Sequence, residues 1–189
     1  EITRSYRVIL DHIRAATFLI SDGVLPGKKD QGYFVRRLIR RAVRYAGKLN
    51  IRKPFAFELS ESVITAYSDA YPQLQKEQSL ITSEIKQEEE KFRKTLASGL
   101  IKIDQIFQNR NDINAQQAFE LYATFGFPVE VLQEEAQGRG KTVDMAGFEQ
   151  EMIKHQELSR TASVGKFKGG LADHSDMSIK YHTATHLLH

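Results

Sequence analysis

The 189-residue chain contains no cysteine. Disulfide bonds and thiolate metal sites are therefore excluded within this sequence, and a cytoplasmic location is expected. The chain also lacks a signal peptide and any apolar run of about 18 residues, so we expect no membrane segment. Its 41% hydrophobic and 27% charged residues are typical of a soluble protein with a packed core.

Acidic residues are missing between Gln31 and Leu49, although this segment is rich in arginine. The segment YFVRRLIRRAVRYAGKL carries five arginines, which are Arg36, Arg37, Arg40, Arg41 and Arg44. On a helix these side chains share an arc of about 140°, and we call them the arginine stripe. Apolar residues fill the opposite arc, which is typical of a helix that packs on a core with one side.

Two interpretations of the arginine stripe remain open. Charged residues usually lie outside, so the stripe is explained equally well as a solvated helix face. However, no acid in the same segment offers an i,i+4 ion pair, and an unpaired basic stripe suggests an anionic partner. Arginine donates in a planar fork that suits phosphates and guanine edges, so nucleic acid is the leading candidate. We therefore expect the stripe to face water or a partner.

Positive charge is concentrated in the first part of the chain. Residues 1–53 carry 13 lysines and arginines against four acids, whereas the other residues have a net negative charge. The basic part is the expected contact region for a polyanion. It includes the loop 26–32 with Lys28 and Lys29, which leads into the arginine helix, where free backbone N–H groups also suit phosphate.

Hydrophobic periodicity predicts an all-α fold for residues 1–160. Helices are expected at about 5–21, 33–49, 55–71, 75–108, 129–137 and 145–160, with a short helix ending before Gly126 and Pro128. The run 75–108 is expected to be a long scaffold helix in preference to a coiled-coil arm, because its heptad pattern is loose. Residues 161–189 have no helical period, and we expect them to begin a separate, β-containing domain.

Two histidines near the end of the sequence, His182 and His186, have a spacing that can bring both imidazoles to one zinc ion on a helix. Surface or core histidines are the other interpretation of this common pattern. A zinc peptidase is disfavoured, because Thr183 stands where the catalytic glutamate would be needed. A zinc site would also need further ligands.

Five segments occur in a distinctive order: YRVILDHIRAATFLISDGVLP, GYFVRRLIRRAVRYAGKL, AFELYATFGFPVEV, FKGGLADHS and HTATHLLH. Together they resemble the alanyl-tRNA synthetases, a family of class II aminoacyl-tRNA synthetases, over residues 6–189. The resemblance implies that residues 1–160 form a helical domain that recognises the acceptor stem of tRNA(Ala), where the family reads a G·U pair. It implies that residues 161–189 begin an editing domain for mischarged tRNA.

The same resemblance implies where the cofactors of the full enzyme bind. Its catalytic domain, which uses ATP and Mg²⁺ to attach alanine to tRNA, would precede this segment, so no catalytic residue is expected here and the chain alone should not make alanyl-tRNA. His182 and His186 would form the first half of the editing domain's zinc motif. No ATP, magnesium or zinc is expected to be bound to this part alone.

The chain departs from the family pattern at two positions that the family associates with the G·U pair. Many members have Pro-Ser-Asn where this chain has Pro26-Gly27-Lys28, and Leu-Tyr-Asp where it has Leu121-Tyr122-Ala123. Neutral divergence and relaxed recognition both explain this. The expected tRNA-binding residues are Lys28, Lys29, Arg36, Arg37, Arg40, Arg41, Arg44 and Ala123.

Other functions remain open at this stage. A non-enzymatic helical DNA- or RNA-binding module would also use an arginine helix, as helix-turn-helix proteins do. An interaction scaffold is a third class, and weak salt dependence of binding would indicate it. The resemblance favours tRNA as the partner, with neither DNA nor a membrane expected.

Overall fold

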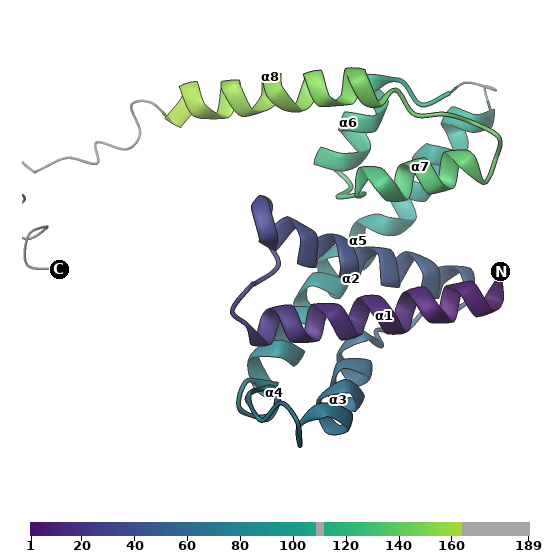
Figure 1. Ribbon diagram of the computed structural model, residues 1–189. Coiled ribbons are helices and arrows are strands. Elements are labelled where there is room, and N and C mark those ends of the chain that lie inside the picture. Colours follow the sequence, from purple (N-terminus) through teal and green to yellow (C-terminus); the bar gives the residue numbers. More distant parts are fainter. Residues whose placement is uncertain (109–111, 164–189) are drawn as a thin grey trace, which may run out of the picture. The chain divides into compact units, whose positions relative to one another are not determined.

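The structure is a computed structural model that describes residues 1–108 and 112–163, with side chains up to residue 158. Helices dominate this part of the chain (Figure 1), and they are α1 (Ile2–Ser21), α2 (Asp30–Lys48), α3 (Ala56–Tyr67), α4 (Gln73–Lys76), α5 (Gln78–Gln108), α6 (Ala115–Ala123), α7 (Val129–Gln137) and α8 (Met145–Ser163). Within the described residues, 1–108 and 112–163, the only β feature is an isolated parallel bridge that joins Ile113 and Val143. The predicted all-α class is therefore confirmed where the structure describes the chain.

The predicted β-containing segment is not seen. Residues 161–163 continue α8, and residues 164–189 lie outside the described part. The long run 75–108 also differs slightly from expectation, because it divides into the single turn α4 and the long helix α5. The helix at 129–137 begins and ends where the sequence predicts, after Pro128 and before Gly138.

Helices α1 and α2 form a hairpin that contains much of the core (Figure 1). Ile9, Ile13 and Ile20 recur at helical spacing on α1 and are buried. They pack on the apolar face of α2, which includes the fully buried Ile39 and Val43. The early part of α1 lies beside the end of α2, since Ile9 clusters there with α2 residues.

Helix α5 is the scaffold of this unit. It packs against α1, α2, α3 and α4, and it buries Ile81, Ile85, Phe92 and Ile103. In a coiled-coil arm, this helix would project from the rest of the unit, and its apolar residues would pack on a partner helix with the same heptad pattern. The scaffold interpretation of this run is therefore confirmed.

The turn between α6 and α7 is fixed to α5 by side chains. Phe127 is fully buried and meets the ring of Phe92 edge-on, with 5.5 Å between ring centroids. Gly99 makes room for it, because a Cβ at this position would lie 2.3 Å from the Phe127 ring. The Thr95 hydroxyl donates to the carbonyl of Phe125 at 2.6 Å. These contacts determine where α7 can lie.

Contacts divide the chain into two compact units, Glu1–Phe148 and Glu149–His189. The first unit holds α1 to α7 and the start of α8, and it contains the candidate site. The expected domain boundary at residue 160 falls inside α8, and the assignment of domains stays a prediction. None of the described helices combines the length and the low polarity that crossing a membrane requires.

Candidate nucleic-acid interface

Arg40, at the centre of the arginine stripe, is buried and fully bonded. Its side chain is 6% exposed, and its Nε lies 2.5 Å from Oε1 of Glu88 on α5. Its Nη1 donates to the carbonyl of Gly126, and its guanidinium lies over the ring of Phe92 at 5.1 Å. Burial lowers the pKa of Arg40 while the Glu88 carboxylate raises it. The guanidinium stays charged, because even a lowered arginine pKa lies far above neutrality.

The rest of the stripe pairs mainly with α7. Arg37 reaches Glu130 at 2.5 Å, Arg41 makes a two-nitrogen contact with one oxygen of Glu134, and Arg44 donates to Glu135 at 2.7 Å. Lys48, one turn beyond Arg44, shares Glu135 at 3.3 Å, and Arg36 lies 3.4 Å from Glu88. The order of partners runs in the same direction along both helices. We call the ion pairs that α2 makes with Glu130, Glu134 and Glu135 the α2–α7 ladder.

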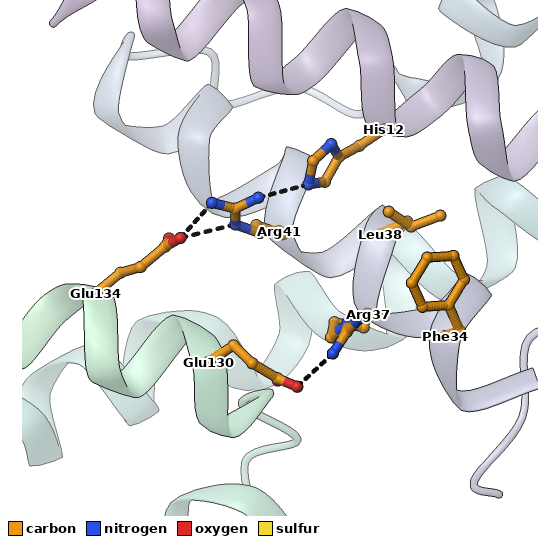
Figure 2. A pocket seen from close by; sticks show the side chains of 7 residues that line it. All are labelled: His12, Phe34, Arg37, Leu38, Arg41, Glu130 and Glu134. Atoms are coloured by element: carbon orange, nitrogen blue, oxygen red, sulfur yellow. Dashed lines mark hydrogen bonds and ion pairs between the residues drawn. The ribbon is translucent and has the colours of Figure 1, made fainter. Parts of the chain in front are cut away.

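A pocket of about 410 Å³ opens beside the first two rungs of the ladder (Figure 2). The pairs Arg37–Glu130 and Arg41–Glu134 line it, and His12 faces Arg41 from α1. Arg41 Nη1 lies 2.8 Å from His12 Nε2, so the ring accepts this hydrogen bond. Burial, followed by the charge of Arg41, lowers the pKa of His12 to about 4. The imidazole is therefore neutral at pH 7.

The expectation that the arginine stripe lacks counter-charge and faces water or a partner is wrong. The missing acids come from Glu88, Glu130, Glu134 and Glu135, which lie 48 to 93 residues further along the chain. Counting only acids of the same helix could not detect these partners. The signal was present, since the acids of α7 recur at helical spacing in EVLQEEA, as the arginines do on α2. Whether these arginines also contact RNA stays a prediction.

The segments that carry the two departures from the family pattern are connected by a ring contact. Lys28 and Lys29 lie exposed in the loop before α2, and Ala123 lies exposed at the end of α6. Their neighbours Tyr33 and Tyr122 are in ring contact, with 6.1 Å between centroids. The start of α2 and the end of α6, which are distant in sequence, are therefore adjacent in space, as a shared recognition surface requires.

The predicted zinc ligands His182 and His186 lie outside the described residues. Within residues 1–108 and 112–163, no group of three or more histidine, cysteine, aspartate or glutamate side chains has a geometry that could hold a metal ion. The zinc motif is therefore untested by the geometry.

Comparison with known proteins places the chain in a family. Residues 1–188 match the family described as tRNA synthetases class II (A), and the chain belongs to this family. The similar curated proteins are alanine–tRNA ligases. The ligase of Borrelia hermsii is 44% identical over 194 aligned positions, which cover the whole chain and 32% of the ligase. The ligase of Borreliella afzelii is 45% identical, covering 98% of the chain and 32% of the ligase.

A relative from another genus gives the same result. The alanine–tRNA ligase of Bacillus mycoides is 44% identical over 167 positions, covering 86% of the chain and 19% of the ligase. The chain thus spans about a third or less of the length of the relatives it matches. These matches do not favour the alternative of a non-enzymatic helical module.

Proposed function

We propose that this chain is the tRNA-binding part of an alanine–tRNA ligase and that it contacts the acceptor stem of tRNA(Ala). The family match and the names of the relatives support tRNA as the partner. In the whole protein, alanine would be attached to tRNA with ATP and Mg²⁺ by residues outside this chain. We place this activity in the cytoplasm.

The contact between Tyr33 and Tyr122 is the observation that carries the proposal. It brings the Lys28-Lys29 loop and Ala123 to one exposed end of the unit, which we call the reading end. Lysine offers donors for phosphates or for guanine O6 and N7, whereas alanine offers no polar group. The reading end therefore lacks a side-chain acceptor for the guanine amino group of a G·U pair at both family positions.

We expect this loss to relax discrimination. Good base contacts are worth about 1–3 kcal/mol each, so the chain should bind acceptor stems with G·U and with G·C within about tenfold of each other. Affinity would then come mainly from phosphate contacts of Lys28 and Lys29.

The test is binding of paired G·U and G·C stem RNAs at fixed salt. The variant Lys28→Asn with Ala123→Asp restores the family's polar groups and should widen the gap between the two RNAs. Lys29→Asn with Thr124→Asp is the matched control, since it makes the same change in net charge one position away. A preference of about hundredfold in the unmodified chain would contradict the proposal and place the readers elsewhere.

The editing function belongs to the same proposal. Residues 161–189 would begin the editing domain, and His182 and His186 would supply two of its zinc ligands once the remaining ligands are present. Support comes only from the order of motifs in the sequence, so elemental analysis of a longer chain is the measurement that tests it.

A further inference from the structure

Ion pairs neutralise part of the positive charge of residues 1–53. Six of the 13 lysines and arginines pair with acids of α5 or α7, namely Arg36, Arg37, Arg40, Arg41, Arg44 and Lys48. Arg14 pairs with Asp11 at 3.0 Å. The other six are exposed and make no ion pair with a described residue, and they are Arg4, Arg7, Lys28, Lys29, Arg52 and Lys53. The positive charge available to a partner therefore lies outside the arginine stripe.

These six cations form two groups at opposite ends of the α1–α2 hairpin. Lys28 and Lys29 belong to the reading end. Arg4 and Arg7 lie on the first two turns of α1, and Arg52 and Lys53 follow α2, so we call these four the basic end. Ile51, beside Arg52, packs against the cluster formed by Ile9 of α1 with Tyr45 and Ala46 of α2, which brings the two pairs of the basic end to the same region.

The backbone that carries Arg52 and Lys53 is held in one conformation by α5. Arg93 donates to the carbonyl oxygens of Arg52 and Lys53, each at 2.9 Å. Arg93 is itself paired with the fully buried Glu89, whose carboxylate also accepts from the N–H groups of Phe55 and Ala56. Since their carbonyls are bonded inward, the two exposed cations are presented on a fixed loop, which lowers the entropy cost of binding.

We propose that the basic end is a second RNA-binding surface, which holds the phosphate backbone of a duplex whose other end lies at the reading end. The charge of the surface carries the argument, because four exposed cations that make no ion pair with a described residue complement a phosphate backbone. The proposal rests on the proposed function, since it takes tRNA as the partner. It assigns the sequence-independent part of the affinity to residues that the family pattern does not single out.

The length of the hairpin adds a geometric condition. Helix α2 has 19 residues, so the two ends are about 28 Å apart along the hairpin. An A-form RNA duplex rises about 2.8 Å per base pair, so only a duplex of about ten or more base pairs contacts both ends at once. A shorter stem can reach the reading end or the basic end, but not both.

The experiment measures binding of the 189-residue chain to RNA stem-loops over a range of salt concentrations. The variant Arg4→Ala with Arg7→Ala removes two cations of the basic end, and we expect the slope of log K against log salt to fall by about one unit per lost phosphate contact. The control Arg14→Ala with Lys91→Ala removes the same net charge from other exposed positions and should change the slope less. Arg4→Lys with Arg7→Lys should keep the slope of the unmodified chain.

The stem length gives an independent arm. On a stem of about 12 base pairs, Arg4→Ala with Arg7→Ala should lower the salt slope fully. On a stem of about five base pairs that contains the G·U pair, the same variant should lower the slope little. An equal slope for the variant and its control on the long stem would overturn the second surface. Failure of the unmodified chain to bind any of these RNAs would instead overturn the proposed function.

Discussion

Arg40 is a charged side chain in a place where charge is costly. Removing an arginine from water is unfavourable unless its donors are bonded and its charge is paired. Arg40 meets both conditions, through Glu88 and the carbonyl of Gly126. The residue therefore ties α2 to α5 and to the turn before α7, and its role is structural even if its neighbours contact RNA.

Gly126 tests this role. Its φ is +71°, and a Cβ there would lie 2.0 Å from Nη1 of Arg40. Gly140 has a similar φ of +66° but nothing within 4 Å of its Cβ position. We expect Gly140→Ala to cost about 1 kcal/mol through backbone strain, and Gly126→Ala about 3 kcal/mol, because it also breaks the Arg40 hydrogen bond. Urea unfolding of both variants measures the difference, and equal losses would contradict the role given to Arg40.

The sequence pattern predicted which residues share a helix face, but it did not predict the ion-pair partner of each residue. Side-chain direction on a helix follows from local geometry, so the arc of Arg36 to Arg44 and the opposite apolar arc were predictable. The partner of Arg40 depends on how α5 and α7 pack, which no local pattern contains. The sequence likewise showed that Lys28 and Ala123 are unusual. That their segments are adjacent became visible only in the structure, through the contact of Tyr33 with Tyr122.

Most helices were predictable as elements because their boundaries have local causes. Pro128 precedes α7 and Gly138 follows it, so both ends agree with the prediction. Asn114 and Gln117 form a reciprocal capping box at the start of α6. The break between α4 and α5 was missed, because neither proline nor glycine marks it. For the pairing between elements, the sequence held only the matching helical spacing of the acids on α7 and the arginines on α2.

The α2–α7 ladder should have a gradient of strength along its length. The carboxylate of Glu130 is 36% exposed and its partner Arg37 is 31% exposed, whereas Glu135 is 6% exposed beside Arg44. Exposed pairs contribute little and are screened by salt, while removing one partner of a buried pair leaves an unpaired charge.

We therefore expect Glu135→Gln to lower the free energy of unfolding by about 3 kcal/mol and Glu130→Gln by about 1 kcal/mol or less. Urea unfolding at low and high salt is the measurement. High salt should remove most of the smaller loss and little of the larger one. Equal losses at both positions would show that the ladder acts as one unit, contrary to this gradient.

Across the molecule, the fold converts a basic sequence segment into two separated groups of free cations. The acids of α5 and α7 pair with the cations of α2 from Arg36 to Lys48, whereas the cations of the reading end and the basic end make no ion pair with a described residue. Net charge along the sequence indicated a polyanion partner, but it did not show which of the cations are paired with acids of α5 and α7. All of this charge distribution lies within the unit Glu1–Phe148.

This unit should therefore keep its stability and its RNA binding without residues 161–189. A chain of residues 1–160 retains Phe148, which is 6% exposed and meets Tyr122 edge-on at 5.6 Å. We expect its free energy of unfolding to lie within about 0.5 kcal/mol of the full chain, with the same salt slope for RNA. A chain of residues 1–144 loses Phe148 and should be about 3 kcal/mol less stable.

The chain of residues 1–144 also tests whether the end of α6 affects the G·U preference without affecting the salt slope. Because Tyr122 lies next to Ala123, loss of Phe148 should disturb the reading end and reduce the widening of the G·U preference by Lys28→Asn with Ala123→Asp. The salt slope should stay nearly unchanged, since none of the six free cations is removed. Urea unfolding and stem-RNA binding of both shortened chains are the measurements. A large loss of stability or of salt slope on removing only residues 161–189 would place part of the interface beyond residue 160, against the predicted domain boundary.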